Sequence, residues 1–191
     1  MPASVDNAKK RKVAVLGARS VGKSCLIKKY IDDTFAESYF PTIETSHTKS
    51  VKYHGQDYSL TIVDTAGQDE FSPMNAQHAI GIHGYVLVYS IASRNSFDMI
   101  KIIYDKIVDY SGITDIPCVI VASKLDLQDS SRQIPVKDGE ALAQECNGAF
   151  VETSSKQDIN VAKVFDLCLA EMERRLAPNQ TEPPAKSCFV M

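Results

Sequence analysis

The chain has no tryptophan, and glycine and proline are scarce, with nine and eight among 191 residues. These counts exclude a fibrous or low-complexity chain, while 44% hydrophobic and 24% charged residues are typical of one folded domain. A basic excess is also missing, because 21 Lys and Arg stand against 24 Asp and Glu and give a net charge of -3. We therefore expect no nucleic-acid binding, which needs a dominant basic face.

Disulfide, membrane and metal-binding patterns are missing as well. The five cysteines are far apart and form no C-x-x-C pair, which favours a reducing compartment. No apolar run reaches the roughly 18 residues of a membrane span, and the first residues lack the apolar core of a signal peptide. The four histidines show no metal-ligand spacing. We expect a monomeric domain in the cytosol.

Apolar runs alternate with segments of helical periodicity. The runs are continuous and rich in β-branched residues, as in strands covered on both faces, and lie at 13–16, 60–63, 85–91, 118–122 and 149–152. Helices are predicted at 23–32, 93–110, 136–147 and 160–176. Segments 45–53 and 57–63 flank a short turn and predict an antiparallel hairpin. The predicted fold class is α/β: a three-layer sandwich with a mostly parallel six-stranded sheet, one antiparallel hairpin strand and helices on both faces.

A phosphate-binding motif follows the first predicted strand. The residues from Gly17 to Ser24 match G-x-x-x-x-G-K-S in the strand-loop-helix context that this motif requires. Gly17 and Gly22 let successive backbone amides point inward at the positive end of a helix. Lys23 supplies a charge for the outer phosphates, and the Ser24 hydroxyl is a ligand for Mg²⁺, which prefers oxygen. The motif predicts that the three-layer sandwich is that of a P-loop NTPase. The loop alone does not distinguish kinases, ATPases and GTPases, although the chain has no Arg-rich lid segment typical of a P-loop kinase.

A second motif places acidic and amide groups after another buried strand. Asp64 ends the run 60–63 and is positioned to hold the Mg²⁺ shell through water. Gly67 offers its amide to the terminal phosphate, and Gln68 is placed to orient the attacking water, because phosphoryl transfer needs positioning and charge stabilisation. Asp64 to Gln68 spell DTAGQ, the signature of the Ras superfamily of GTPases, which the chain resembles over nearly its whole length.

This resemblance assigns roles to the segment between the two motifs. Residues Tyr39, Phe40, Pro41, Thr42, Ile43 and Glu44 are similar to the family's first switch, which also contacts effectors. Thr42 corresponds to the threonine that closes over Mg²⁺ and the terminal phosphate, so Gln68, Lys23 and Thr42 are the expected catalytic residues. Phe35 falls where the family stacks an aromatic ring on the base. Phe40 departs from the usual Asp, which puts partner contacts there in doubt.

Guanine is expected to be read after the run 118–122. Asp126 can accept hydrogen bonds from the N1 and N2 donors of guanine, whereas adenine would leave the carboxylate unpaired. Ser123 stands where the family has Asn; a hydroxyl is shorter and has fewer donors, so we predict a weakened or water-filled contact and faster nucleotide release. The resemblance implies these nucleotide-binding residues: Arg19, Ser20, Val21, Gly22, Lys23, Ser24, Cys25, Phe35, Tyr39, Thr42, Gly67, Ser123, Lys124, Asp126, Ser154, Ser155 and Lys156.

Details of the motifs resemble the Rheb branch. Arg19 replaces the usual Gly in the sequence RSVGKS, DTAGQDEFS follows, and the chain ends in CFVM. The resemblance implies slow hydrolysis, a tuberin-type GTPase-activating protein and activation of the TOR kinase complex in growth or nutrient signalling. Arg19 either crowds the terminal phosphate or points to solvent. The alternatives are a Ras- or Rap-like plasma-membrane signaller and a GTP-binding module with negligible hydrolysis.

The end of the chain carries a lipidation signal. Cys188 begins a C-a-a-X box whose terminal Met usually directs farnesyl transfer by a prenyltransferase. One lipid chain without a polybasic stretch anchors weakly. We therefore expect the cytoplasmic face of endomembranes, such as the lysosome or vacuole, rather than the plasma membrane, and a cytosolic pool. Three segments are predicted: a polar, basic lead-in at 1–11, the GTPase domain at 12–177 and a flexible tail at 178–191.

Overall fold

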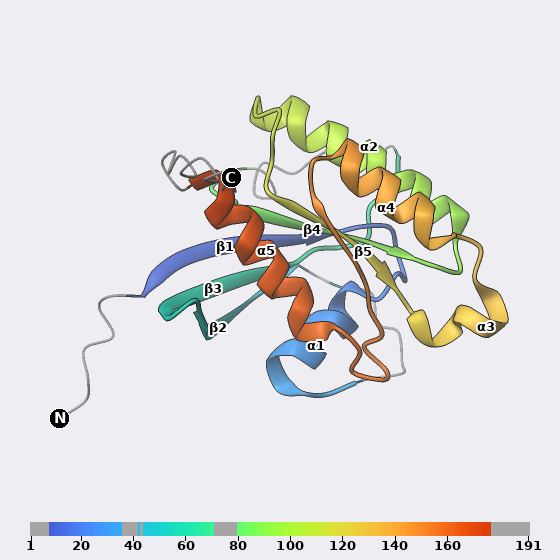
Figure 1. Ribbon diagram of the computed structural model, residues 1–191, viewed down its shortest axis with the longest axis horizontal. Coiled ribbons are helices and arrows are strands. Elements are labelled where there is room, and N and C mark those ends of the chain that lie inside the picture. Colours follow the sequence, from blue (N-terminus) through green and yellow to red (C-terminus); the bar gives the residue numbers. More distant parts are fainter. Residues whose placement is uncertain (1–7, 36–41, 43, 71–79, 177–191) are drawn as a thin grey trace, which may run out of the picture.

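The computed structural model describes residues 8–35, 42, 44–70 and 80–176 (Figure 1). Strands and helices alternate along most of the chain, as predicted. In order, they are β1 (Lys9–Leu16), α1 (Lys23–Asp32), β2 (Thr45–Tyr53), β3 (Gln56–Asp64), β4 (Gly84–Ser90), α2 (Arg94–Ser111), β5 (Cys118–Ser123), the 3-10 turn η2 (Leu125–Leu127), α3 (Gln128–Ser131), α4 (Val136–Glu145), β6 (Ala149–Glu152) and α5 (Val161–Leu176).

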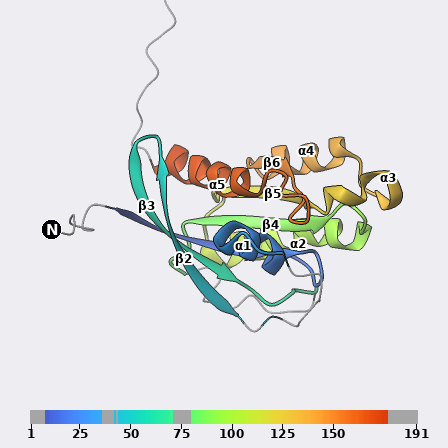
Figure 2. The same cartoon turned by 90° about the horizontal axis from the view of Figure 1, so that it is seen from below.

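The six strands form one sheet in the order β2-β3-β1-β4-β5-β6. Figure 2 shows β2 and β3 side by side at one end of the molecule, away from α3 and α4. All neighbours are parallel except β2 and β3, whose antiparallel register pairs Tyr53 with Gln56 around the His54–Gly55 turn. β4 and β5 are buried along their whole length, because helices cover both faces of the sheet. The predicted fold class, including the hairpin, is confirmed.

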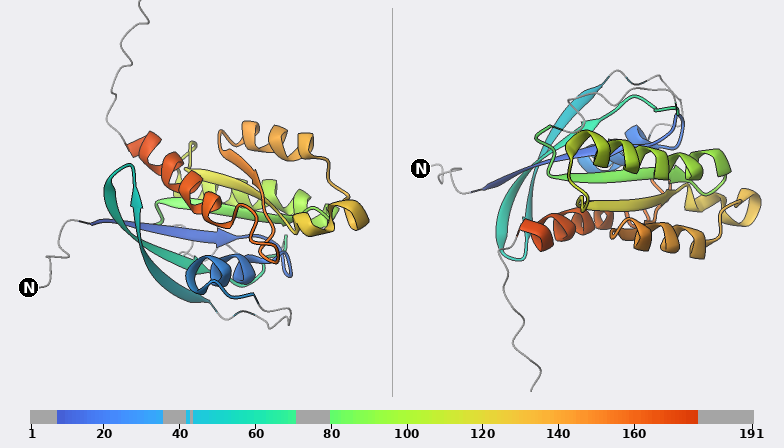
Figure 3. Two further views of the ribbon diagram at one scale, coloured as in Figure 1. Left: turned by 60° about the horizontal axis from the view of Figure 1, so that its bottom comes forward. Right: turned by 90° about the horizontal axis from the view of Figure 1, so that it is seen from above.

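The connections divide the helices between the two faces. The chain passes from β4 through α2 to β5, and from β5 through α4 to β6, in one direction along the sheet, and it passes from β1 through α1 to β2 in the other direction. Because such crossovers are right-handed, α1 lies on the face opposite to α2 and α4. α5 packs beside α1 and against β4 to β6 (Figure 3). Within the described residues, no helix combines the length and apolarity needed to cross a bilayer.

The end of the predicted lead-in 1–11, residues 9–11, is part of the sheet. β1 already begins at Lys9, which pairs with Tyr58 of β3. Arg11 donates from Nε to Glu173 of α5 over 3.0 Å, and its guanidinium lies 5.8 Å from the Tyr58 ring centre. The cations fit on a strand because α5 supplies a carboxylate and β3 an aromatic face.

Candidate functional site

The loop between β1 and α1 has the shape of an anion cradle. Gly22 has φ 99° and ends the loop as the N-terminal cap of α1, which has no side-chain cap and no acidic residue in its first turn. The first amides of the helix are therefore available to a ligand, at its positive end. Position 17 requires glycine because the backbone passes close to β4: a Cβ there would lie 2.2 Å from the carbonyl oxygen of Val88.

Lys23 is folded back into this loop. Its Nζ donates to the carbonyl oxygens of Gly17 at 3.0 Å and Ala18 at 2.8 Å. Burial lowers the pKa of Lys23 to about 8, although the nearby Asp64 charge opposes the shift. Within the described residues, the hydrogen bonds of this buried cation go to neutral carbonyls, which compensate a buried charge incompletely. The loop is thus suited to an anionic ligand.

Three oxygen-bearing side chains meet next to Lys23. The hydroxyls of Ser24 and Thr42 lie 2.9 Å apart. Asp64, at the end of β3, is 4% exposed, and its Oδ1 has no hydrogen-bond partner in the described part of the chain. Burial raises the pKa of Asp64, while the Ser24 hydrogen bond and the Lys23 charge oppose this. Two hydroxyls and a buried carboxylate oxygen form a donor set that fits Mg²⁺.

Gln68 and Gly67 lie against the cradle. The backbone N–H of Gln68 donates to the Gly17 carbonyl oxygen over 3.1 Å, and the Gln68 residue is only 9% exposed. A Cβ on Gly67 would lie 2.4 Å from Cγ of Arg19, so only glycine fits there. The Arg19 side chain is 73% exposed, and its Nη2 lies 3.9 Å from Oδ2 of Asp69. Of the two orientations considered for Arg19, the structure shows the solvent-facing one.

The segments after β5 and β6 form the other end of the site. Asp126 accepts a hydrogen bond on Oδ1 from the Ser154 hydroxyl at 2.6 Å. The Leu125 amide donates to the Thr153 carbonyl oxygen over 3.0 Å, and the Thr153 amide donates to the Ala122 carbonyl oxygen over 2.8 Å. Ser154 is fully buried. These bonds hold Asp126 in place through one carboxylate oxygen and leave the other to meet a base.

Ser123 joins the two ends directly. Its hydroxyl oxygen lies 2.6 Å from the carbonyl oxygen of Val21 in the cradle and 2.7 Å from that of Tyr89 in β4. Of the two outcomes predicted for Ser123, a weakened or a water-filled contact, the water-filled one does not hold for the tie between these loops, because β5 brings the hydroxyl within hydrogen-bond distance. A weakened contact stays a prediction. A hydroxyl has one proton, so it donates to one carbonyl at a time, whereas an Asn amide has two donors.

The remaining predicted residues lie around this site or outside the described residues. Phe35 is 38% exposed after α1, as a stacking platform requires, and Lys124 adopts a left-handed φ of 63° directly after β5. Cys25 is half-buried in α1, whereas Lys156 is exposed in the loop after β6. Tyr39, Phe40, Pro41, Ile43 and Cys188 fall outside the described residues, so their assigned roles stay predictions.

The sequence did not predict a contact that a lysine far from the motifs makes beside Gln68. Lys106 of α2 donates from Nζ to the carbonyl oxygen of Glu70, just after Gln68, over 2.7 Å. No local pattern marks this lysine.

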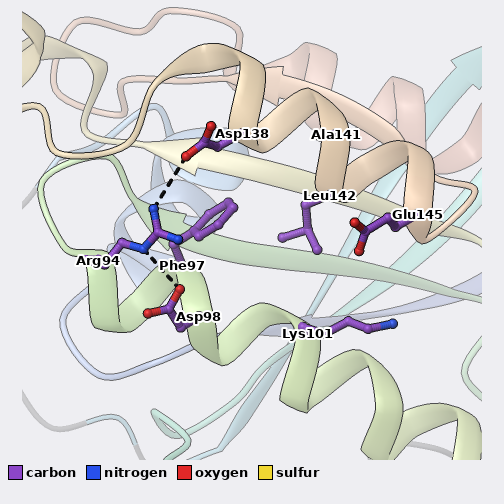
Figure 4. A pocket seen from close by; sticks show the side chains of 8 residues that line it. All are labelled: Arg94, Phe97, Asp98, Lys101, Asp138, Ala141, Leu142 and Glu145. Atoms are coloured by element: carbon purple, nitrogen blue, oxygen red, sulfur yellow. Dashed lines mark hydrogen bonds and ion pairs between the residues drawn. The ribbon is translucent and has the colours of Figure 1, made fainter.

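A groove of about 370 Å³ between α2 and α4 was also not predicted from the sequence (Figure 4). Its rim is closed by Arg94, which pairs with Asp98 at 3.1 Å and Asp138 at 3.4 Å, and none of its lining residues belongs to the motifs.

Comparisons with known proteins agree with this arrangement. The model of the Ras family matches residues 12–174. The chain is 47% identical over 191 residues to the small monomeric GTPase RhbA of Aspergillus fumigatus, covering 100% of both chains. It is 44% identical over 184 residues to the GTP-binding protein Rheb of Homo sapiens and to the Rheb homolog of Dictyostelium discoideum, covering 96% of this chain and 98% of each relative. The predicted family is confirmed: this chain belongs to the Ras family, in its Rheb branch.

Proposed function

We propose that this Rheb-like small GTPase binds GTP and GDP with Mg²⁺, hydrolyses GTP slowly to GDP and phosphate, and acts as a membrane-anchored signalling switch. One observation carries the proposal. The buried Lys23 and the Asp64 oxygen that has no partner in the described part of the chain lie at one end of the site, and Asp126, fixed by Ser154, lies at the other. The first end suits phosphates and a hard cation, and the second suits the donor edge of guanine.

Each residue of the phosphate end has a physical task. Ser24, Thr42 and, through water, Asp64 would hold Mg²⁺, which neutralises charge on the outer phosphates. Lys23 adds a fixed positive charge, and the amide of Gly67 faces the terminal phosphate. Gln68 orients the attacking water. Because Thr42 and Gly67 reach the terminal phosphate only when it is present, its loss on hydrolysis releases both segments and switches the protein off.

Slow turnover is supported by the position of Gln68. This residue is only 9% exposed, so little of the side chain is available to a water molecule in this state. A partner that supplies a polar side chain at the site would raise the rate, and a tuberin-type GTPase-activating protein is the partner that the Rheb resemblance implies. The module that binds GTP with negligible hydrolysis is the second candidate function.

The signalling role and location rest on the Rheb relatives and the C-a-a-X box. We place this chain upstream of the TOR kinase complex, attached by a farnesyl group on Cys188 to the cytoplasmic face of endomembranes. In live cells, the Cys188→Ser variant should be found in the cytosol rather than on membranes. Stable residence of the wild-type chain at the plasma membrane would instead favour a Ras- or Rap-like role.

The test of the core proposal uses the purified full chain. Bound nucleotide is extracted and identified, its release rate is measured with Mg²⁺ and with a chelator, and single-turnover GTP hydrolysis is followed with and without an activating protein. We expect guanine nucleotide, faster release in chelator, and slow hydrolysis that the activator accelerates. Preference for ATP or absence of nucleotide would refute the proposal, and hydrolysis that no activator accelerates would favour the binding module.

A further inference from the structure

We propose that Lys29 is a positioning residue that ties together the two loops flanking the guanine site and thereby slows nucleotide release. The inference rests on the proposed nucleotide binding. Lys29 lies in the last turn of α1, outside every motif. Its Nζ is 2.5 Å from Oδ1 of Asp33 and 3.7 Å from Oδ2 of Asp158, so one cation bridges two carboxylates.

The two carboxylates belong to the segments that carry the base-contacting residues. Asp33 caps α1 in a left-handed conformation, with φ 56°, and stands two positions before Phe35. Asp158 also has a left-handed φ of 57° and stands two positions after Lys156. Lys29 therefore links the phenylalanine side of the site to the side that contains Ser154.

Among the described residues, the backbone bonds of Asp33 and of the Asp158 loop stay within their own segments. Asp33 is tied to its own helix, because its amide donates to the Lys29 carbonyl oxygen over 3.1 Å. The loop of Asp158 is closed on itself by two bonds between Ser154 and Ile159, at 2.9 and 3.1 Å. Lys29 is 15% exposed, whereas the side chains of Asp33 and Asp158 are 83% and 59% exposed. The cation thus provides a bridge between two loops that each fold on their own.

The end of α1 is fixed well enough for this bridge to restrain the loops. Tyr30, next to Lys29, stacks on Phe165 of α5 with ring centres 4.0 Å apart. Since α1 is held in this way, separation of the loops must break the ion pairs of Lys29. Release of a base enclosed between Phe35 and the Ser154 loop requires such a separation. Without Lys29 the two carboxylates would also repel each other and favour the open arrangement.

The test measures release of fluorescent GDP from the full chain after adding excess unlabelled GDP. We expect Lys29→Ala to accelerate release by about three- to fivefold, a small factor because exposed ion pairs are weak, and the difference should shrink at high salt. Lys29→Arg should retain slow release. Single-turnover GTP hydrolysis should be unchanged, because Lys29 contacts none of the residues that hold the phosphates.

A matched control is available on α2. Lys101 and Asp105 form the same i,i+4 ion pair, at 3.1 Å, away from the base-contacting segments, so Lys101→Ala should leave release unchanged. Combining Lys29→Ala with Asp158→Asn should give less than the product of the two single effects. Equal release from the Lys29 and Lys101 variants, or independent effects in the double variant, would overturn the inference while the proposed function stands. Absence of guanine-nucleotide binding by the wild type would overturn both.

Discussion

The two ends of the site differ in how far the protein completes them itself. At the base end, Asp126, Ser154 and Thr153 are held by hydrogen bonds between protein groups. At the phosphate end, Asp64 has a buried oxygen without a partner among the described residues, and Lys23 keeps its buried charge against two neutral carbonyls. The base end is preorganised, whereas the phosphate end is completed only by a ligand.

This difference suits a switch. A preorganised base end gives constant affinity for both forms of a nucleotide, because guanine is common to GTP and GDP. The incomplete phosphate end gains different contacts from GTP and from GDP, because the two differ in their number of phosphates. A ligand shifts an equilibrium between two conformations only if it binds them with different affinity, and these contacts supply such a difference. Both ends therefore contribute to affinity, but the base end decides which base is bound and the phosphate end responds to the number of phosphates, so substitutions at the two ends should differ in what else they change.

The largest effect is expected at the phosphate end, from Lys23→Met. Removing the buried cation should weaken GDP binding by about 100-fold, or ~2.7 kcal/mol, as for the loss of hydrogen bonds to a charged group. Lys28→Met, on the exposed side of the same helix, is the control and should change affinity less than threefold. Affinity measured by calorimetry on nucleotide-free protein checks both, and equal losses in the two variants would contradict a special role for Lys23.

Asp126→Asn should have a similar effect at the base end but change selectivity. The Asn amide presents a donor where guanine also has a donor, so GDP affinity should fall by roughly 100-fold. Xanthosine diphosphate, with a carbonyl in place of the guanine amino group, should bind better to the variant than to the wild type. Asp129→Asn, on the exposed α3, should alter neither affinity. Unchanged preference for guanine in Asp126→Asn would show that the carboxylate does not read the base.

A pH titration should affect the phosphate end alone. The pKa of Lys23 is lowered to about 8 by burial, and a bound polyphosphate stabilises the charged form. GDP affinity should therefore be constant below pH 8 and fall by about tenfold towards pH 9, as the free protein loses the Lys23 proton. The lowered pKa also affects the free energy of unfolding of the nucleotide-free protein. This free energy rises as the pH increases from about 8 to the usual lysine pKa, and the gain is lost as the pH falls back through 8. Lys23→Met should abolish the pH dependence of affinity.

Much of the fold follows from local patterns. The strand-loop-helix motif places Lys23 and Ser24 at the start of α1, and the turn at His54 and Gly55 joins β2 to β3, as predicted. The edges of elements were harder to predict. The predicted lead-in at 1–11 overlaps the start of β1. The partners of Lys9 and Arg11, Tyr58 and Glu173, lie on β3 and α5, and Arg11 and Glu173 are 162 positions apart.

The site shows the same division. Motif spacing predicted residues that the structure brings together in two groups, because each motif is a contiguous segment at the carboxyl end of a strand. It could not identify Lys29 or Lys106, whose partners come from segments far apart in the sequence. The orientation of Arg19 was equally undecidable, since it depends on the placement of Asp69 across the loop. Pairings between distant segments are set by tertiary packing, which no local pattern records.

The smallest effect is expected where the two ends meet, at Ser123. This hydroxyl already contacts Val21 and Tyr89, so the site lacks only the second donor of an amide. Ser123→Asn should slow GDP release several-fold, or about 1 kcal/mol, if the longer side chain donates to both the cradle and the neighbouring group. Ser123→Ala should accelerate release by removing the tie altogether. Release that fails to slow in the Asn variant would mean that the single hydroxyl bond already couples the base end to the phosphate end as strongly as an amide does.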